Sequence, residues 1–174
     1  MITHKVPPQL WCSRTENGKF RCAPPKNNPA SNKPIGGCWT STFTPNAEWC
    51  SDWLEWCSME EPDWLTGNCE VLIPKDNVRV FVLNSLKDLK ELYSKYGTVV
   101  EENGRKYYTL NWEKMAKDLD GVWLTKEGVK NLTRFVYSEV PDLYGWDAES
   151  IVWFRDVFKK KIPIDEVKRR CRVK

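Results

Sequence analysis

The chain has 174 residues, a length typical of one domain. Apolar residues make up 41% and charged residues 29%, which excludes a disordered chain, and no apolar run reaches the roughly 18 residues that span a bilayer. The net charge of +3 is divided unevenly, because basic residues outnumber acids in residues 1–36 and 155–174 and acids outnumber basic residues between them. Basic ends favour a phosphate-bearing partner, with solubility alone as the alternative.

The start of the chain and its cysteines indicate a cellular compartment. Met1 to Lys5 lack the features of a secretory signal, so we expect a cytoplasmic protein. We also expect no membrane partner, and a monomer. The seven cysteines are odd in number and irregularly spaced, so we expect thiols and no disulfide framework. His4 is the only histidine, and we expect no metal, although scattered thiolates leave structural zinc as the alternative.

Residues 1–36 are rich in Pro, Asn, Lys and Gly and predict a basic loop region that contains one strand at 9–13. A second strand is predicted at 38–43, directly after Gly36-Gly37. Three- and four-residue spacing of Trp49, Trp53 and Trp56 predicts an amphipathic helix over 47–58 that buries these side chains.

The rest of the chain alternates short strands with helices. We predict helices at 85–97, capped by Ser85 and stopped by Gly97, and at 111–118, with a tight turn at Asn103-Gly104 between them. The predicted strands are 70–73, 77–83, 107–110, 121–124 and 150–154. This pattern predicts a single α+β domain of short twisted strands with two to four helices. Residues 37–155 would form its core, and residues 156–174 a basic tail.

Motif searches exclude several chemistries. The sequence has neither a P-loop nor a Gly-x-Gly-x-x-Gly turn, and a Ser-His or Cys-His nucleophile would depend on His4 alone. Glu149 is the carboxylate that attracts attention, because it directly precedes the apolar run 150–154. A fixed negative charge there could stabilise a cationic sugar. The alternative is an exposed glutamate at a strand end with no role.

The stretch Ala148-Glu149-Ser150-Ile151-Val152-Trp153 resembles the strand that carries the catalytic glutamate in the ADP-ribosyltransferase superfamily. In that superfamily an Arg or His ends the first core strand, and a Ser-Thr-Ser element begins a second. Arg14 is similar to the first marker and Thr40-Ser41-Thr42 to the second, in the same order along the chain. The resemblance implies an ADP-ribosyltransferase-like core.

The resemblance also implies roles for individual residues. Glu149 and Ser41 would be catalytic, with Glu149 stabilising the cationic ribose as nicotinamide leaves. The residues that would bind NAD, as substrate, are Arg14, Trp39, Thr40, Thr42 and Tyr144. For each site an ordinary structural role is the alternative, and Arg14 in a basic loop could be solvated or contact a phosphate.

The whole chain also resembles a group of small phage-encoded proteins. They share a Lys-Pro-x-Gly-Gly-x-Trp-Thr-Ser element, here residues 33–41, a Trp-x-x-Trp-Cys element at 53–57, and Trp-Asp-x-x-Ser at 146–150. This resemblance implies action in the cytoplasm of an infected host cell, in conflict between phage and host.

The sequence therefore leaves three hypotheses. The first is an NAD-dependent ADP-ribosyltransferase that modifies a nucleic acid or a protein. The second is a non-catalytic module that binds nucleic acid or protein. The third is an NAD-independent enzyme that cleaves N-glycosidic bonds. In each, the basic terminal residues Lys168, Arg169, Arg170 and Arg172 could bind nucleic acid.

The tryptophan content of the chain gives a further expectation. Ten tryptophans are many for this length, and Trp11, Trp39 and Trp146 lie within three residues of Arg14, Ser41 and Glu149. We expect these three to line one site.

Overall fold

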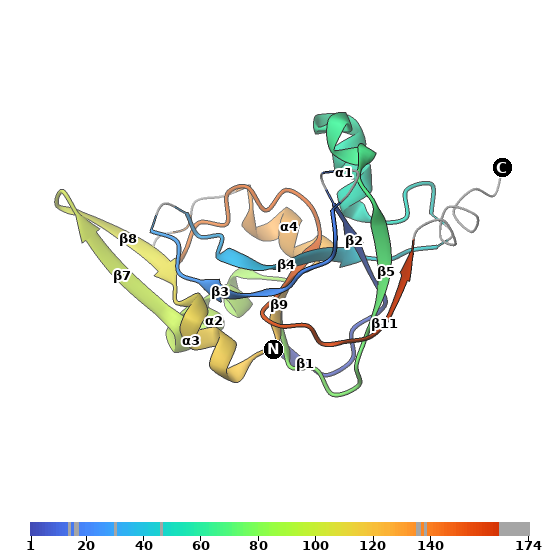
Figure 1. Cartoon of the computed structure of the whole chain (residues 1–174). Coiled ribbons are helices and arrows are strands. Elements are labelled where there is room, and N and C mark those ends of the chain that lie inside the picture. The colour runs from blue at the N-terminus through green and yellow to red at the C-terminus, as the bar shows by residue number, and fades with distance from the viewer. Residues whose placement is uncertain are drawn as a thin grey trace.

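The computed structural model describes residues 1–163, apart from positions 14, 16, 17, 30, 46, 135, 136 and 138. Within this range the chain forms one α+β domain in which a curled mixed sheet of nine strands is accompanied by four α-helices and a separate two-stranded hairpin (Figure 1). The predicted α+β class and single domain are therefore confirmed, whereas the ADP-ribosyltransferase-like core stays a prediction. No helix in this range is long and apolar enough to cross a membrane.

The strand order in the large sheet is β1-β6-β9-β10-β4-β2-β5-β11, and β3 pairs with β4 beside this path. Its strands are β1 (Ile2–Thr3), β2 (Gln9–Cys12), β3 (Ala23–Lys26), β4 (Ile35–Thr42), β5 (Cys69–Pro74), β6 (Val80–Leu83), β9 (Gly121–Leu124), β10 (Ser150–Trp153) and β11 (Phe158–Pro163). The pair β6–β9 is parallel, and the other pairs are antiparallel.

The helices are α1 (Asp52–Glu60), α2 (Leu86–Tyr96), α3 (Trp112–Asp118) and α4 (Lys126–Leu132), with a short 3-10 helix η1 (Pro62–Thr66) after α1. Strands β7 (Gly97–Glu102) and β8 (Arg105–Leu110) form the hairpin, which projects from the body of the molecule (Figure 1). Asn103 and Gly104 both have positive φ angles, of 52° and 73°, as the predicted tight turn requires.

Both faces of the sheet centre are buried, and the two faces of β10 show this clearly. Val152 packs in the cluster that contains α2, α3 and α4, whereas Ile151 and Trp153 point to the other face. There the curl of the sheet brings β10 together with Leu72 of β5 and Phe158 of β11 in a second cluster. A strand buried on both faces reads as a continuous apolar run, which is why 150–154 was recognisable.

Gly36 and Gly37 allow three strands to approach closely. Both residues have positive φ angles, of 82° and 73°. A Cβ atom on Gly36 would lie 2.8 Å from the carbonyl oxygen of Pro24, and one on Gly37 would lie 2.9 Å from Val152 Cγ2. The glycine pair therefore lets β4 pass between β3 and β10, and it sets the direction in which the following residues of β4 point.

Several predicted boundaries were wrong. The helix predicted over 47–58 begins only at Asp52, because Ser51 is its N-cap and accepts a hydrogen bond from the Leu54 amide. The region 1–36 contains β1 and β3 in addition to the predicted strand. Helix α4 was not predicted, and residues 158–163, expected in a tail, form β11 against β5. The remaining residues 164–174 lie outside the described range.

The prediction that the cysteines are all thiols was also wrong. Cys12 of β2 lies directly opposite Cys69 of β5, with 3.9 Å between their Cα atoms, and the two form a disulfide. Cys50 is disulfide-bonded as well. Linear spacing did not reveal the first pair because the bonded residues are 57 positions apart and meet only through the sheet register.

Candidate functional site

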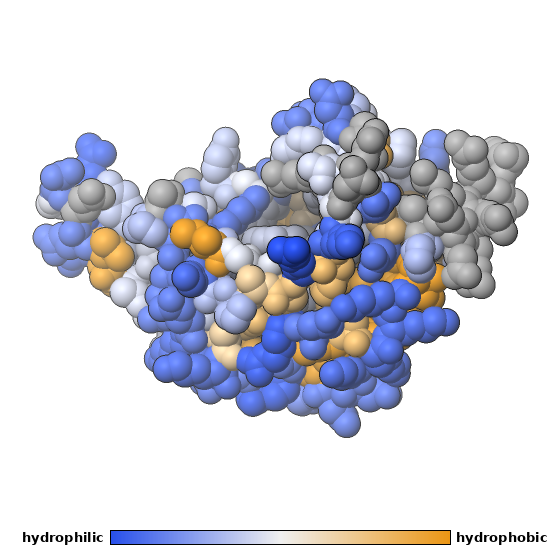
Figure 2. All heavy atoms as spheres, in the orientation of Figure 1, coloured by the Kyte–Doolittle hydropathy of each residue, from blue (hydrophilic) through white to orange (hydrophobic). Residues whose placement is uncertain are grey.

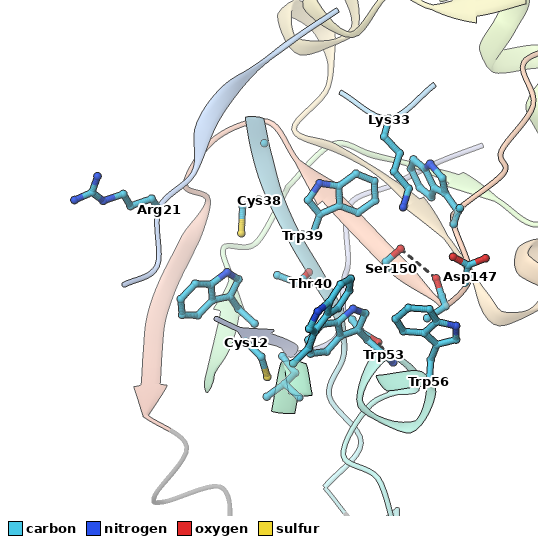
Figure 3. A pocket seen from close by; sticks show the side chains of 18 residues that line it. Cys12, Arg21, Lys33, Cys38, Trp39, Thr40, Trp53, Trp56, Asp147 and Ser150 are labelled. Carbon is cyan, nitrogen blue, oxygen red and sulfur yellow. Dashed lines mark hydrogen bonds between the residues drawn. The ribbon is translucent and has the colours of Figure 1, made fainter. Parts of the chain in front are cut away.

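A pocket of about 530 Å³ opens between α1 and the part of the sheet formed by β2 and β4. Figure 2 shows a largely hydrophilic surface that is hollowed at the foot of α1. Six tryptophans line the pocket, namely Trp11, Trp39, Trp53, Trp56, Trp64 and Trp146. Trp39 of β4 lies on one side, with Trp53 and Trp56 of α1 on the other (Figure 3).

The polar groups of the pocket lie mainly at its rim. Lys33 lies with its ammonium nitrogen 5.6 Å from the centre of the Trp39 ring, and Asp147 projects nearby (Figure 3). Arg21 also contributes to the wall, but its side chain points away from the other lining residues. The pocket thus combines flat aromatic walls with a cation and a carboxylate at its opening.

Neighbouring aromatic rings hold several of these tryptophans in place. Trp39 packs edge-on against Trp146, at 4.8 Å between ring centres, and Trp146 stacks on the buried Trp112 of α3. On the opposite wall Trp56 contacts Trp64, at 5.9 Å between ring centres. The wall that contains Trp39 is therefore continuous with the hydrophobic core through Trp146. The opposite wall is supported by Trp64 of η1.

The Glu149 carboxylate lies beside the pocket and is only 3% exposed. One of its oxygens accepts hydrogen bonds from Ser41 Oγ and the Thr42 amide, each at 2.8 Å. The other accepts from Thr42 Oγ1 at 2.8 Å and from Trp123 Nε1 at 2.5 Å. Four donors satisfy this carboxylate fully, which is how a buried negative charge becomes tolerable.

Asp52 connects the carboxylate cluster to α1. Its side chain accepts a hydrogen bond from the Glu149 amide at 2.8 Å, and its other oxygen forms a 2.8 Å ion pair with Lys126. The bond to Asp52 raises the pKa of Lys126, against an opposing effect of burial, and the charges of Asp52, Glu55 and Glu149 add to the increase. Ser41 Oγ also accepts from the Trp53 amide at 3.3 Å. The first turn of α1 is therefore fixed to β4, β10 and α4.

The structure brings together some of the predicted site residues. Ser41, Thr42 and Glu149 are in direct contact, because β4 and β10 are neighbouring strands with Thr40 opposite Ile151. Trp39, Thr40 and Ser41 line the pocket, as do Ala148 and Ser150, whereas Glu149 is not among its lining residues. The three tryptophans expected to share a site, Trp11, Trp39 and Trp146, all line it.

Other predicted site residues lie away from the pocket, or their polar groups are engaged in the core. Tyr144 is 82% exposed and is not among the residues that line the pocket. Thr40 Oγ1 donates to the Gln9 side chain and accepts from Trp153 Nε1, so its hydroxyl is engaged inside the core. Arg14 lies outside the described residues, as do Lys168, Arg169, Arg170 and Arg172.

Sequence reasoning missed several residues of the site. It assigned Trp49, Trp53 and Trp56 to a buried helix face, but Trp53 and Trp56 line the pocket and Trp49 is 38% exposed before α1. A signal was present, because the helix around them carries Asp52, Glu55 and Ser58 and has no complete apolar face. Only Cys57 of this helix is buried.

Comparisons with known proteins provide no relative for this site. No protein-family model, curated protein or solved structure matches the chain. Within the described residues no group of three or more His, Cys, Asp or Glu side chains is placed to hold a metal ion.

Proposed function

We propose that the tryptophan-lined pocket binds a nucleotide, with NAD as the first candidate. The observation that carries this proposal is the convergence of six tryptophans on one pocket that has Lys33 at its rim. A volume of about 530 Å³ lies in the range of small-molecule sites. Flat indole faces stack on nucleobases, and a lysine at the opening suits a phosphate.

The buried cluster of Glu149, Ser41 and Asp52 supports a binding role by holding the pocket in shape. Glu149 and Ser41 join β10 and β4, and together with Asp52 they fix the first turn of α1. That turn carries Trp53, so the cluster sets the separation of the two aromatic walls. Glu149 is then a positioning residue, and this favours a binding module as the basic function of the pocket.

The binding proposal is tested with Trp56→Ala, which removes one aromatic wall of the pocket. Loss of one stacking partner costs about 1–3 kcal/mol, so the Kd for NAD should rise about five- to 150-fold. Titration calorimetry with NAD, ADP-ribose, AMP and a short single-stranded DNA measures the effect and identifies the preferred ligand.

Trp49→Ala is the matched control, because Trp49 lies three residues before α1 and is not among the lining residues. Its affinity should equal that of the wild type. Equal losses in both variants, or no binding of any of the four probes by the wild type, would refute a nucleotide site in this pocket.

A second candidate function is ADP-ribosyl transfer to a nucleic acid or protein. The contact between Ser41 and Glu149 favours it, since these are two residues to which the superfamily resemblance assigns catalytic roles. Glu149 would then have to exchange one of its four donors for a ribose hydroxyl. The carboxylate would stabilise the positive charge that develops on the ribose as the bond to nicotinamide breaks.

Release of nicotinamide from labelled NAD tests this second candidate, with and without DNA, RNA or cell lysate. Transfer predicts release together with labelling of one of these acceptors. Glu91→Gln, at an exposed carboxylate that is not among the lining residues, should retain release. Binding of NAD without release would leave the pocket as a binding module. Release of a base from DNA without NAD would instead indicate the third hypothesis, an N-glycosidic enzyme.

A nucleic-acid partner remains part of the proposal through the basic segments. Of the lysines in β11, Lys159 pairs with Asp76 at 3.1 Å and Lys161 with Asp156 at 2.6 Å. Phosphate binding there would compete with these exposed pairs and would weaken steeply as salt is added. A salt titration of DNA binding with a slope near zero would exclude these contacts.

A further inference from the structure

Two pairs of cysteines face each other across antiparallel strands, one within a strand pair and one at the end of a strand pair. The first is Cys12 and Cys69, which form the disulfide between β2 and β5. The second follows from the register of β3 and β4, in which Ala23 is opposite Gly37. One position further along, this register places Cys22 opposite Cys38. The same arrangement therefore occurs twice, once as a disulfide and once as two thiols.

The contacts of the second pair give its two thiols different characters. Cys22 is partly exposed and lies directly before β3, whereas Cys38 is buried in β4. The hydrogen bond from Cys38 lowers the pKa of Cys22 despite its partial burial. Burial raises the pKa of Cys38, and its bond to Cys22 adds to that increase. Cys22 also contacts the carbonyl oxygen of Trp153, 3.5 Å from its sulfur.

We propose that Cys22 and Cys38 form a redox couple that small-molecule disulfides, such as oxidised glutathione, convert to a second cross-strand disulfide. The Cys22 thiolate attacks one sulfur of the small disulfide and displaces one small thiol. Cys38 then gives up its proton and attacks the Cys22 sulfur, which displaces the second small thiol. Two protein thiols are thus oxidised while one small disulfide is reduced to two thiols.

The partly exposed Cys22 is the entry point of this reaction and the buried Cys38 is the resolving thiol. Cys38 also lies in the wall of the pocket, between Gly37 and Trp39. Closing the bridge would tie β3 to the strand that carries Trp39. The couple is independent of the proposed nucleotide binding, because its chemistry needs no ligand in the pocket.

The test exposes the folded protein to oxidised glutathione, blocks the remaining thiols and maps peptides without reduction. The wild type should yield a peptide pair joined through Cys22 and Cys38, with the Cys12–Cys69 bridge retained. In Cys38→Ser the reaction should stop at glutathione attached to Cys22, because the resolving thiol is absent. In Cys22→Ser, Cys38 should remain a thiol.

Cys57→Ser is the matched control, since Cys57 is a buried thiol on α1, and it should behave like the wild type. Three results for the wild type would overturn the proposal. These are glutathione that stays on Cys22 without a bridge, a bridge that joins either thiol to Cys12 or Cys69, and unreacted Cys22 and Cys38. The wild-type result alone supports or overturns the proposal, so the test remains decisive even if a serine variant fails to fold.

Discussion

At the scale of single residues, Glu149 determines how the candidate site can work. Each of its two oxygens accepts one hydrogen bond from a hydroxyl and one from an N–H group. The N–H donors are the Thr42 amide and the Trp123 indole. A hydroxyl can rotate and accept a hydrogen bond instead, but an N–H group can only donate. The site is therefore built for a carboxylate and not for an amide.

Glu149→Gln should consequently destabilise the fold. Whichever way the new amide is turned, its NH2 group faces an N–H donor that loses its acceptor. A buried unsatisfied donor costs about 1–3 kcal/mol, so the urea midpoint of unfolding should fall accordingly. The exposed neighbour Asp147 gives the control, because Asp147→Asn should change stability by no more than about 0.5 kcal/mol. If both variants unfold at the wild-type midpoint, the four hydrogen bonds are not holding the site together.

The residue scale also shows how far the sequence predicts the site. Ser41 and Glu149 were expected to belong to one catalytic site, and they are in direct contact because the strands predicted at 38–43 and 150–154 pair with each other. The roles of Trp53 and Trp56 were not, because three- and four-residue spacing gives the period of a helix but not the environment of its apolar side. Asp52 was missed because it contacts Glu149 across 97 positions of the chain.

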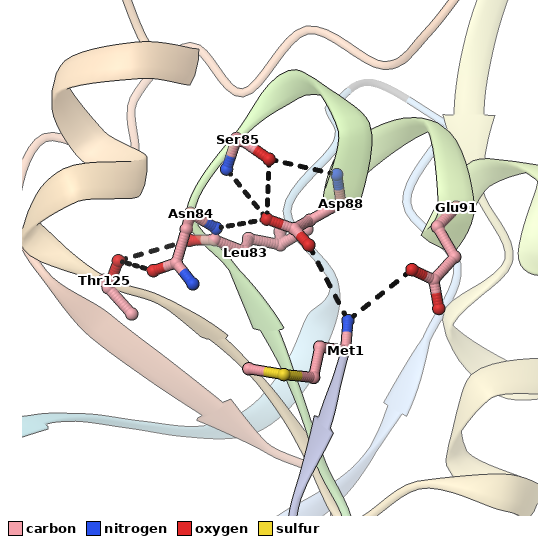
Figure 4. A network of polar contacts seen from close by, with 7 residues as sticks. All are labelled: Met1, Leu83, Asn84, Ser85, Asp88, Glu91 and Thr125. Atoms are coloured by element: carbon pink, nitrogen blue, oxygen red, sulfur yellow. Dashed lines mark hydrogen bonds and ion pairs between the residues drawn. The ribbon is translucent and has the colours of Figure 1, made fainter.

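At the scale of elements, α2 illustrates structure that local chemistry specifies. Asp88 accepts hydrogen bonds from the Asn84 amide and from the Ser85 amide and hydroxyl, and Ser85 Oγ accepts from the Asp88 amide (Figure 4). The N-terminal amine lies 3.8 Å from both Asp88 and Glu91. Burial alone would raise the pKa of Asp88, but these hydrogen bonds and the amine outweigh it and lower the pKa.

This capping box should make stability depend on pH. Because the pKa of Asp88 is lower in the folded state, ionised Asp88 stabilises the fold at neutral pH, and this contribution disappears as pH falls through the folded pKa. Asp88→Asn should cost about 0.3–2 kcal/mol at pH 7, the range for losing a carboxylate at a helix N-terminus. The difference from the wild type should shrink below about pH 4. Thermal unfolding across pH measures both effects.

Glu91→Gln is the control for α2. Its side chain is largely exposed and lies the same 3.8 Å from the N-terminal amine, but it is no part of the capping box. It should be nearly neutral at every pH. A penalty for Asp88→Asn that persists unchanged at low pH would assign the effect to side-chain shape and not to charge.

Elements formed by tertiary contacts were less predictable. Helix α4 has Gly128 in its middle, which argues against a helix by intrinsic propensity. A Cβ atom at Gly128 would lie 2.1 Å from the carbonyl oxygen of Leu83, so the glycine is what allows α4 to pack against the end of β6. Strand β3 contains two consecutive prolines, and it was predicted to be loop because proline lacks the N–H group that a strand pair uses.

At the scale of the whole molecule, the Cys12–Cys69 disulfide joins two strands at one end of the pocket. The bridge closes a loop between residues 57 positions apart, and Cys12 lines the pocket next to Trp11. Cross-linking such distant positions restricts the unfolded chain, which stabilises the folded state.

The double variant Cys12→Ala, Cys69→Ala should therefore lose about 2–4 kcal/mol of unfolding free energy. Urea denaturation without reductant provides the measurement, and Cys57→Ser, which removes a thiol outside the bridge, provides the comparison. An unchanged midpoint in the double variant would mean that the bridge adds nothing to the stability of this fold.

The position of β10 in the middle of the sheet bears on how the chain is made. On the ribosome, β9 and β4 are both synthesised before β10, yet each needs β10 as its partner. A nascent chain that ends before residue 150 has two partial sheets with unpaired inner edges, the kind of edge that recruits other strands. The interval before β10 emerges from the ribosome is therefore the one in which we expect a chaperone to matter most to folding.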